Sequence, residues 1–345
     1  MEKRYSMKKH LKSVYRKCNQ EDKTKYKYVL TQNERNYPLP KDLLEEFFNS
    51  LKQTDICFYP NTTSLKNKIC NYYDIDTQNL LLTPGSTFAI KTIFETFDIK
   101  NKNIITSDYC FPMYQVFCDL YQTELRKAKY VNMKLDISNI LSLIDKNTKF
   151  IILANPNSPL GDLYSEKDIV VLLETGIHVI IDEAYIEFTG QDSCIHLIKK
   201  YSNLTVTKTF SKAYGAAGCR VGFLVSAKQN LEYLSKFRAM YEINGVGAKY
   251  TEFILDNIQD YNSYINKTFV DKQLAIKQLK KLGYTIIDTD ASWFFVKRWD
   301  KKDNLKVFNN LGMSFRTLIL PDGEEYIKFN YDLKLHNDQN NPFKY

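Results

Sequence analysis

Short apolar segments alternate with helical segments between about residues 60 and 230 of this chain. The clearest apolar segment covers residues 149–154, reads K-F-I-I-L-A, and runs into a turn rich in Asn and Pro. Strands that are apolar on both faces are typical of buried parallel sheets. Their alternation with helices predicts an α/β fold, and ligands of such folds bind at the carboxyl ends of the strands.

The rest of the pattern predicts a large domain followed by a smaller α+β domain. We expect an N-terminal arm with part of the small domain over residues 1–45, the large domain over 46–255 and the small domain over 256–345. Further strands are predicted at residues 80–83, 104–106, 178–181, 284–287, 293–296 and 325–330. Helices are predicted at residues 41–52, 64–73 (capped by Thr63 or Ser64), 88–97, 165–174, 257–282 and 305–311.

Composition narrows the class of protein. With 44% hydrophobic and 26% charged residues, the chain is neither disordered nor membrane-like, and no apolar run approaches the ~20 residues of a membrane span. Seven cysteines without a C-x-x-C motif predict reduced thiols in a cytoplasmic protein, and four scattered histidines predict no metal site. We expect no secretory signal.

Net charge is +8, and much of it lies in a basic segment over residues 3–17. This segment lacks the interleaved glycines and stacking aromatics of a nucleic-acid module, so we expect a solvated helix or arm rather than a nucleic-acid or membrane contact. A basic surface also favours small anionic substrates.

The stretch at residues 205–222 reads T-V-T-K-T-F-S-K-A-Y-G-A-A-G-C-R-V-G. A strand end leads into the hydroxyls of Thr209 and Ser211, then Lys212, several small residues and Arg220. Hydroxyls, close backbone approach and an arginine suit an anion. They would hold Lys212 beside that anion, as Schiff-base chemistry with a phosphorylated aldehyde requires. The alternative is a Gly/Ala-rich loop with an exposed lysine.

Two other strand ends carry polar groups. The segment H-V-I-I-D-E-A-Y places Asp182 at the end of a buried strand, where a desolvated carboxylate needs a cationic partner such as a pyridinium N–H. His178, at the other end, is read as a strand-edge residue rather than a catalyst. After residues 80–83, a Pro-Gly turn and a helix start leave free backbone N–H groups at Ser86 and Thr87.

Together, D-E-A-Y and the S-K…G-x-R block resemble the pyridoxal-phosphate (PLP) segments of fold-type-I aminotransferases, most closely the histidinol-phosphate aminotransferase group. The resemblance runs from about residue 29 to residue 331. It implies a large domain with a mostly parallel seven-stranded sheet between helices, and a cytoplasmic homodimer with shared active sites. It implies PLP as cofactor, with Lys212 as the Schiff-base lysine, Asp182 on the pyridine nitrogen and Tyr185 on the phenolic oxygen. The phosphate would be held by Thr209, Ser211, Arg220, Ser86 and Thr87.

The resemblance assigns further positions. Phe111 would stack on the ring, and Asn157 or Ser158 would take the usual asparagine contact with the phenolic oxygen, with Leu160 in place of a threonine. Tyr59 would reach the cofactor phosphate of the partner subunit. The alternative is that Tyr59 is an interface or core tyrosine without a cofactor contact. On the substrate side the resemblance points to Asn33, Arg316 and Lys328. Lys328 stands where the family has a carboxylate-clamping arginine, and both cations could instead be edge-strand surface charge.

The implied reaction is transfer of an amino group from an amino acid, by family habit L-glutamate, to a phosphorylated ketone. Four departures from the family pattern, at Phe111, Ser158, Leu160 and Lys328, favour a small ketone such as dihydroxyacetone phosphate, which would give serinol phosphate. Imidazole acetol phosphate is the alternative acceptor. Two other classes stay open, a PLP decarboxylase or lyase of a phosphorylated amino acid and a non-catalytic regulatory protein.

Overall fold

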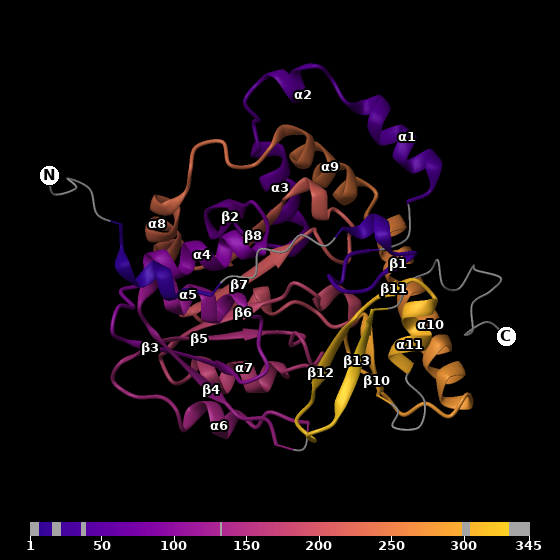
Figure 1. Ribbon diagram of the computed structural model, residues 1–345. Coiled ribbons are helices and arrows are strands. Elements are labelled where there is room, and N and C mark those ends of the chain that lie inside the picture. The colour runs from indigo at the N-terminus through magenta and orange to yellow at the C-terminus, as the bar shows by residue number, and fades with distance from the viewer. Residues whose placement is uncertain (1–6, 16–21, 36–38, 132, 299–303, 331–345) are drawn as a thin grey trace, which may run out of the picture.

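The computed structural model describes residues 7–15, 22–35, 39–131, 133–298 and 304–330 (Figure 1). Its core is a seven-stranded sheet in the order β2-β8-β7-β6-β5-β3-β4. Only β8 runs antiparallel to its neighbours. The predicted α/β fold with a mostly parallel seven-stranded sheet is confirmed. The strands are β2 (Leu80–Thr83), β3 (Asn103–Ser107), β4 (Glu124–Ala128), β5 (Thr148–Ala154), β6 (His178–Asp182), β7 (Leu204–Thr209) and β8 (Gly222–Ser226).

Helices cover both faces of this sheet, which explains why its strands are apolar throughout. In β5, Ile151 and Leu153 belong to one buried cluster, whereas Phe150 and Ile152 belong to the cluster on the opposite face. The first face is covered by α3 (Thr63–Tyr73), α6 (Ile137–Leu141), α7 (Glu166–Leu173) and α9 (Gly245–Asp256). The second face is covered by α4 (Ser86–Thr96), α5 (Met113–Tyr121) and α8 (Lys228–Leu234).

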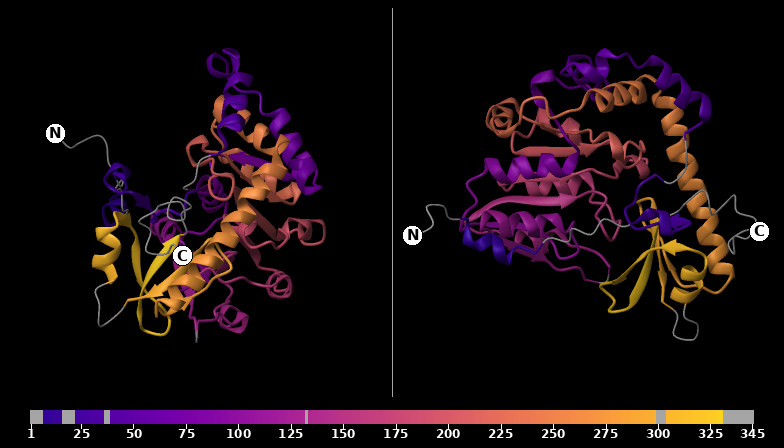
Figure 2. Two further views of the ribbon diagram at one scale, coloured as in Figure 1. Left: turned by 90° about the vertical axis from the view of Figure 1, so that its right-hand side faces the viewer. Right: turned by 45° about the horizontal axis from the view of Figure 1, so that its top comes forward.

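A smaller antiparallel sheet, in the order β12-β13-β10-β9, lies beside the carboxyl-terminal half of a long helix (Figures 1 and 2). The predicted small α+β domain is confirmed. Its elements are α10 (Ile258–Lys281), β9 (Ile286–Ile287), β10 (Trp293–Lys297), α11 (Asn304–Asn310), β11 (Met313–Ser314), β12 (Arg316–Ile319) and β13 (Glu325–Asn330).

The long helix α10 connects the two bodies. Tyr261 and Ile265, near its start, are buried in the core of the large sheet, whereas Ala275 and Ile276 are buried in the small domain. The N-terminal segment also joins the small domain, because β1 (Tyr28–Val29) pairs in parallel with β11. The boundaries at residues 45 and 255 stay predictions.

The N-terminal region differs in detail from expectation. A 3-10 helix at Lys9–Ser13 lies against the large domain, where the His10 ring is 3.1 Å from the carbonyl oxygen of Leu120. Residues 1–6 and 16–21 of the basic segment lie outside the described residues. Two short helices, α1 (Lys41–Ser50) and α2 (Thr54–Cys57), follow.

The predicted cap of the next helix, α3, was wrong. Its N-cap residue is Thr62, whose side chain makes no capping bond. Instead, Asn61 Oδ1 accepts a hydrogen bond of 3.0 Å from the backbone N–H of Thr63. The side chain of Asn61 therefore forms an Asx turn that satisfies the backbone N–H of Thr63, the first residue of α3.

A buried ion cluster joins β7 to the residues that follow β6. Lys208 is 2% exposed, and its Nζ lies 2.8 Å from Glu187 and 3.2 Å from Glu183. Burial alone would lower the pKa of Lys208, but the two carboxylates raise it above its ordinary value. Glu183 also accepts hydrogen bonds from the Ser193 hydroxyl and the backbone N–H of Cys194. The cluster connects β6, β7 and the segments that follow β6.

We expect Lys208→Met to lower the free energy of unfolding by about 3–5 kcal/mol, because it leaves two buried carboxylates without their cation. Urea unfolding at neutral pH measures this loss. Lys199→Met is the matched control, since Lys199 pairs with Asp74 on the surface and its loss should leave unfolding unchanged. Equal stability of Lys208→Met and the native protein would contradict a structural role for the cluster.

Candidate functional site

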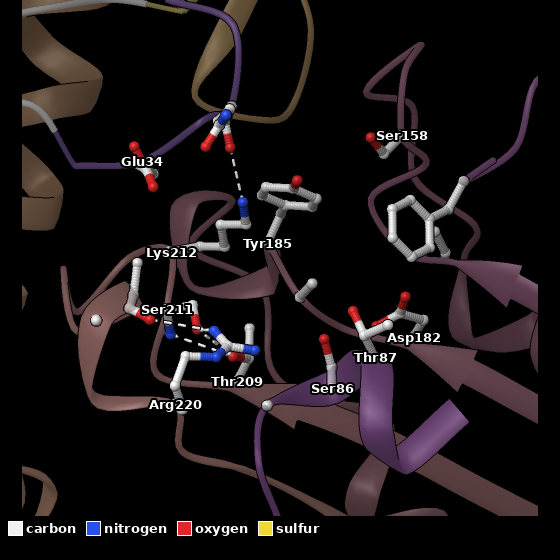
Figure 3. Close-up of a pocket in the computed structure, with 17 residues that line it drawn as sticks. Glu34, Ser86, Thr87, Ser158, Asp182, Tyr185, Thr209, Ser211, Lys212 and Arg220 are labelled. Atoms are coloured by element: carbon white, nitrogen blue, oxygen red, sulfur yellow. Dashed lines mark hydrogen bonds between the residues drawn. The ribbon is translucent and has the colours of Figure 1, made fainter. Parts of the chain in front are cut away.

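A cavity of about 360 Å³ opens where the parallel strands end and α4 begins (Figure 3). Most residues that the sequence singled out meet here. They come from the turn into α4, the end of β6, the segment after β7 and the turn before β8. Phe111, before α5, and Ser158, after β5, complete the set. The predicted residues that line the cavity are Ser86, Thr87, Phe111, Ser158, Asp182, Tyr185, Thr209, Ser211, Lys212 and Arg220.

One end of the cavity is built for an anion. Arg220 Nη1 lies 3.4 Å from Ser211 Oγ, and its Nη2 donates to the carbonyl of Pro84 at 3.1 Å. The hydroxyl of Thr209 donates to Ser211 Oγ at 3.0 Å. Gly85 has a φ of +85°, which disfavours any other residue, and a Cβ there would lie 2.7 Å from Arg220 Nη2, so the guanidinium would have to shift. The free amides and positive dipole end of α4, which starts at Ser86, face the same place.

Asp182 lies deep in the cavity, at the end of β6. It is 4% exposed, and its Oδ1 accepts a hydrogen bond of 2.9 Å from the Thr207 hydroxyl. Its Oδ2 accepts one of 3.2 Å from the Tyr114 hydroxyl. Burial raises the pKa of Asp182 to about 6 in spite of both donors. No basic side chain pairs with Asp182 among the described residues. A cationic N–H group on a ligand would supply the missing charge.

Tyr114 and Thr207 were not among the site residues predicted from the sequence. Tyr114 is fully buried in α5, and its partner is 68 residues away in the chain, so no local pattern could reveal the contact. Thr207 lies directly opposite Asp182 in the sheet register, and a strand alignment would have found it.

Lys212 lies under the N-terminal segment. Its Nζ donates a hydrogen bond of 2.7 Å to the backbone carbonyl of Gln32 and is 5.7 Å from the centre of the Tyr185 ring (Figure 3). Asn33, which was expected to face the substrate, is buried outside the cavity lining, and its side chain donates to the Tyr185 hydroxyl at 3.2 Å. Its neighbour Glu34 lines the cavity instead and forms an ion pair with Lys23.

The structure separates the two alternatives for the asparagine contact. Ser158 lines the cavity, whereas Asn157 does not and is 1% exposed. The Asn157 amide donates to the Tyr130 hydroxyl at 2.5 Å, and its Oδ1 has no hydrogen-bond partner among the described residues. Leu160, which follows in the same turn, is buried in an apolar cluster with Trp293. Of the two candidates, Ser158 is the one that lines the cavity, and which of them contacts the phenolic oxygen stays a prediction.

Besides Asn33 and Asn157, three more predicted site residues lie outside the cavity lining. Tyr59 is 77% exposed and stacks on Tyr241 with ring centres 4.2 Å apart, so it faces away from this chain's own site. Arg316 on β12 is exposed, and Lys328 on β13 lies directly opposite it and is buried. Their roles stay predictions.

The residues present fit PLP. An arginine, hydroxyls and a helix start meet the needs of a phosphate, and a buried carboxylate without a cation suits a protonated ring nitrogen. An aromatic side chain, Phe111, is available to the ring, and an amine, Lys212, to the aldehyde. Gly85, where any side chain would displace Arg220, is the structural sign that this cradle must stay open.

Neither a metal-ion site nor a membrane-spanning helix is found in the part of the chain that the structure describes. No group of three or more His, Cys, Asp or Glu side chains there could hold a metal ion. No helix in the described ranges is both long enough and apolar enough to cross a membrane.

Comparison with known proteins gives concordant findings. The family model described as aminotransferase class I and II matches residues 25–322. A histidinol-phosphate aminotransferase from Clostridium novyi (strain NT) is 30% identical over 315 residues, which are 88% of this chain and 87% of that protein.

Two solved structures share the fold. A histidinol-phosphate aminotransferase from Sinorhizobium meliloti, in complex with pyridoxal-5'-phosphate, has a TM-score of 0.81 at 18% identity and covers 94% of this chain and 93% of its own. An L-threonine-O-3-phosphate decarboxylase from Porphyromonas gingivalis has a TM-score of 0.74 at 22% identity, with 88% and 94% covered.

The Tyr114 hydrogen bond should depend on the charge of Asp182. Tyr114→Phe is expected to lower the free energy of unfolding by about 1.5–3 kcal/mol above pH 6, where Asp182 is ionised, and by about 0.5–1.5 kcal/mol below it. The sign follows because the hydroxyl favours the ionised carboxylate, so its contribution falls as Asp182 gains a proton. Denaturant unfolding of the cofactor-free protein at the two pH values measures it.

Tyr250→Phe provides the control for this experiment. It removes the acceptor of a buried hydrogen bond of 3.1 Å from Tyr261, in which both partners are neutral over this pH range. Its cost should be the same at both pH values. A Tyr114→Phe cost that is equally independent of pH would contradict the proposed contact.

Proposed function

Because this chain belongs to the aminotransferase class I and II family, we propose that it moves an amino group from L-glutamate to a phosphorylated ketone. The protein is a PLP-dependent transaminase similar to histidinol-phosphate aminotransferases. The observation that carries the proposal is the meeting of Lys212, Asp182 and the anion cradle around Arg220 in one cavity.

We assign the cofactor contacts from this geometry. Arg220, Ser211, Thr209 and the start of α4 bind the phosphate, and Asp182 faces the ring nitrogen. Its two hydroxyl donors orient the carboxylate and favour its ionised form, which is the form that holds a protonated ring nitrogen. Tyr185 and Ser158 are the donors for the phenolic oxygen, and Phe111 lies against the ring. PLP, when bound, supplies an electron sink for carbanion chemistry at the amino-acid α-carbon.

Lys212 acts as the proton carrier in this assignment. Its Nζ is at hydrogen-bonding distance from the Gln32 carbonyl, so the N-terminal segment can hold the amine when it is free. From there the amine could take a proton from the substrate α-carbon as general base and later release that proton as general acid. Gln32 and Glu34 line the cavity above Lys212, so this segment restricts access of water.

Arg316 and Lys328 are the proposed anion-binding residues on the substrate side. They lie opposite each other on neighbouring strands of the small sheet, and the electrostatic field of Lys212 reaches Lys328. Such a group of cations suits a substrate with a carboxylate or a phosphate. We assign the buried amide of Asn33, which holds the Tyr185 hydroxyl, an indirect role at the substrate-facing side.

For the acceptor, the departures at Phe111, Ser158, Leu160 and Lys328 support a small phosphorylated ketone such as dihydroxyacetone phosphate. The similarity to the Clostridium novyi relative supports imidazole acetol phosphate as the second candidate. The Porphyromonas gingivalis decarboxylase has a similar fold, so decarboxylation of a phosphorylated amino acid is the alternative reaction. An assay for release of CO2 from phosphorylated amino acids tests it.

The reaction is tested with the purified, PLP-loaded protein. L-Glutamate alone should discharge the visible absorbance of the lysine-linked cofactor and yield 2-oxoglutarate. Dihydroxyacetone phosphate and imidazole acetol phosphate, added separately, should restore that absorbance at different rates. The faster one identifies the acceptor. CO2 without 2-oxoglutarate would contradict transamination.

Replacing the proposed catalytic lysine gives a sharper result. Lys212→Ala should lose the visible absorbance of the lysine-linked cofactor and at least about 10⁴-fold in turnover, because the variant lacks both the covalent link and the proton carrier. The exposed Lys199 gives a control variant, Lys199→Ala, that should react normally. Normal turnover by Lys212→Ala would rule out the mechanism.

We further propose that the protein works as a homodimer. Exposed apolar side chains gather around the stacked pair Tyr59 and Tyr241, namely Ile56, Phe58 and Met240. Gly245 lies so close to the backbone of Asp55 that a Cβ would be 2.2 Å from its carbonyl oxygen, so glycine is what allows the two segments to approach this closely. In a dimer this face would be covered, and Tyr59 could reach the partner's cofactor phosphate.

Mixing two variants tests the shared site. Tyr59→Ala should form dimers that release PLP faster, because a phosphate contact is lost. In heterodimers of Tyr59→Ala with Lys212→Ala, the site that keeps Lys212 should recover native PLP retention, since the partner supplies Tyr59. Sedimentation measures the dimer, and absorbance measures PLP release. A fully active monomer, or no recovery in the heterodimer, would contradict the proposal.

A further inference from the structure

Trp293 touches three parts of the molecule that the proposed function uses separately. It lies on β10 of the small domain and is fully buried. Its indole N–H donates a hydrogen bond of 2.8 Å to the carbonyl of Pro159, in the turn that carries Ser158. Its ring meets the Tyr185 ring edge-on, with centres 4.9 Å apart. The Nζ of Lys328 lies 3.6 Å from the centre of the indole ring.

Lys328 itself is in an electrostatically unfavourable place. It is 7% exposed, and its cross-strand neighbour Arg316 carries the same charge. Like charges directly opposite each other in a sheet are destabilising. Lys212, from the large domain, adds a third positive charge within electrostatic range. No carboxylate pairs with Lys328 in the described part of the chain.

These surroundings leave the indole as the main favourable contact of the ammonium group. A cation over an indole face is attracted by the ring, and the attraction is larger when both are removed from water. The indole is fixed in turn by its hydrogen bond to Pro159 and by its edge contact with Tyr185. An ammonium held in this way, among other cations and without an anion, is prepared for an anion that comes from outside the protein.

We propose that Trp293 is a positioning residue that holds Lys328 for the anionic group of the substrate, a carboxylate or a phosphate. This proposal rests on the proposed function and refines it, because it makes the positive charge of Lys328 depend on pH and on the bound anion. Lysine can lose its proton, whereas an arginine at this place could not. At a pH where Lys328 has lost its proton, its amine would take one from solvent as the anion arrives, and the bound anion would stabilise the resulting ammonium.

The pH dependence follows from the groups that face Lys328. Burial first, and then Lys212 and Arg316, lower the pKa of Lys328 well below its ordinary value. A bound anion raises it again. Anion affinity should therefore be constant below the lowered pKa of the free form and should fall as pH rises through and above it. A residue with a merely structural role would not produce this dependence.

Calorimetric titration of the PLP-loaded protein with sulfate tests the proposal, because sulfate does not titrate between about pH 6 and about pH 9. Acetate forms a second arm, and whichever of the two binds more tightly tells whether a phosphate or a carboxylate is the natural group. In wild type, affinity should fall by up to about tenfold per pH unit above the free pKa, with up to one proton taken up per anion. Lys328→Arg should keep the affinity and lose both the pH dependence and the proton uptake.

Trp293→Phe is expected to weaken sulfate binding about fivefold, because a phenyl ring is a weaker partner for a cation and lacks the donor to Pro159. Its pH dependence should shift to lower pH, since the ammonium loses support. The control is Phe294→Leu, a buried neighbour on the same strand that packs against Phe329 in the other cluster of the small domain. It should bind sulfate as wild type does.

A fluorescence measurement complements the titration, because the chain has two tryptophans. In a Trp299→Phe background, emission from Trp293 alone should change when sulfate binds, and Lys328→Met should abolish the change. Wild-type affinity and pH dependence in Trp293→Phe, equal weakening in Phe294→Leu, or no binding of either anion would each overturn the proposal. If the protein forms no lysine-linked PLP, the proposed function is contradicted and not the role of Trp293. The visible absorbance of the lysine-linked cofactor is therefore measured before any anion is added.

Discussion

A buried carboxylate without a cation, Asp182, is the constraint around which this site is arranged. Removing such a group from water costs free energy, which here raises its pKa to about 6 even with two hydroxyl donors attached. Proteins tolerate this only where the missing charge arrives with a ligand or where neighbouring groups hold the carboxylate in place. Here Thr207 and Tyr114 hold it, and the ring of PLP is the proposed source of the charge.

The same sheet register serves structure and function on opposite faces. Asp182 lies opposite Thr207 in the pairing of β6 with β7, and the next residue of each strand, Glu183 and Lys208, joins the buried ion cluster on the other side. Because side chains alternate along a strand, one register places the Asp182 carboxylate on the cavity face of the sheet. The same register places the ion pair that joins the two strands on the opposite face. β7 then continues directly into Ser211 and Lys212, so the rigidity of the sheet is passed to the proposed catalytic amine.

Most core strands and the groups at their ends could be predicted from the sequence because both have local signatures, whereas β4 and β8 were not predicted. Apolar runs predicted the core strands, and the residues after them predicted which side chains would meet in the cavity. Contacts between distant segments were out of reach, as Tyr114 on Asp182 and Trp293 on Lys328 illustrate. Whether Asn157 or Ser158 lines the cavity depends on the conformation of one turn. Neighbouring residues in this turn point to different places, Ser158 into the cavity and Asn157 into the protein interior. The pairing of β1 with β11 joins the two ends of the chain, and no local pattern predicts it.

The central claim is that Lys212 carries the cofactor. Borohydride reduction of the PLP-loaded protein followed by proteolysis and mass spectrometry tests it most directly, because reduction makes the link to the lysine permanent. The account predicts a single modified peptide, with the phosphopyridoxyl group on Lys212. Modification of a different lysine, or none in a protein saturated with PLP, would contradict it.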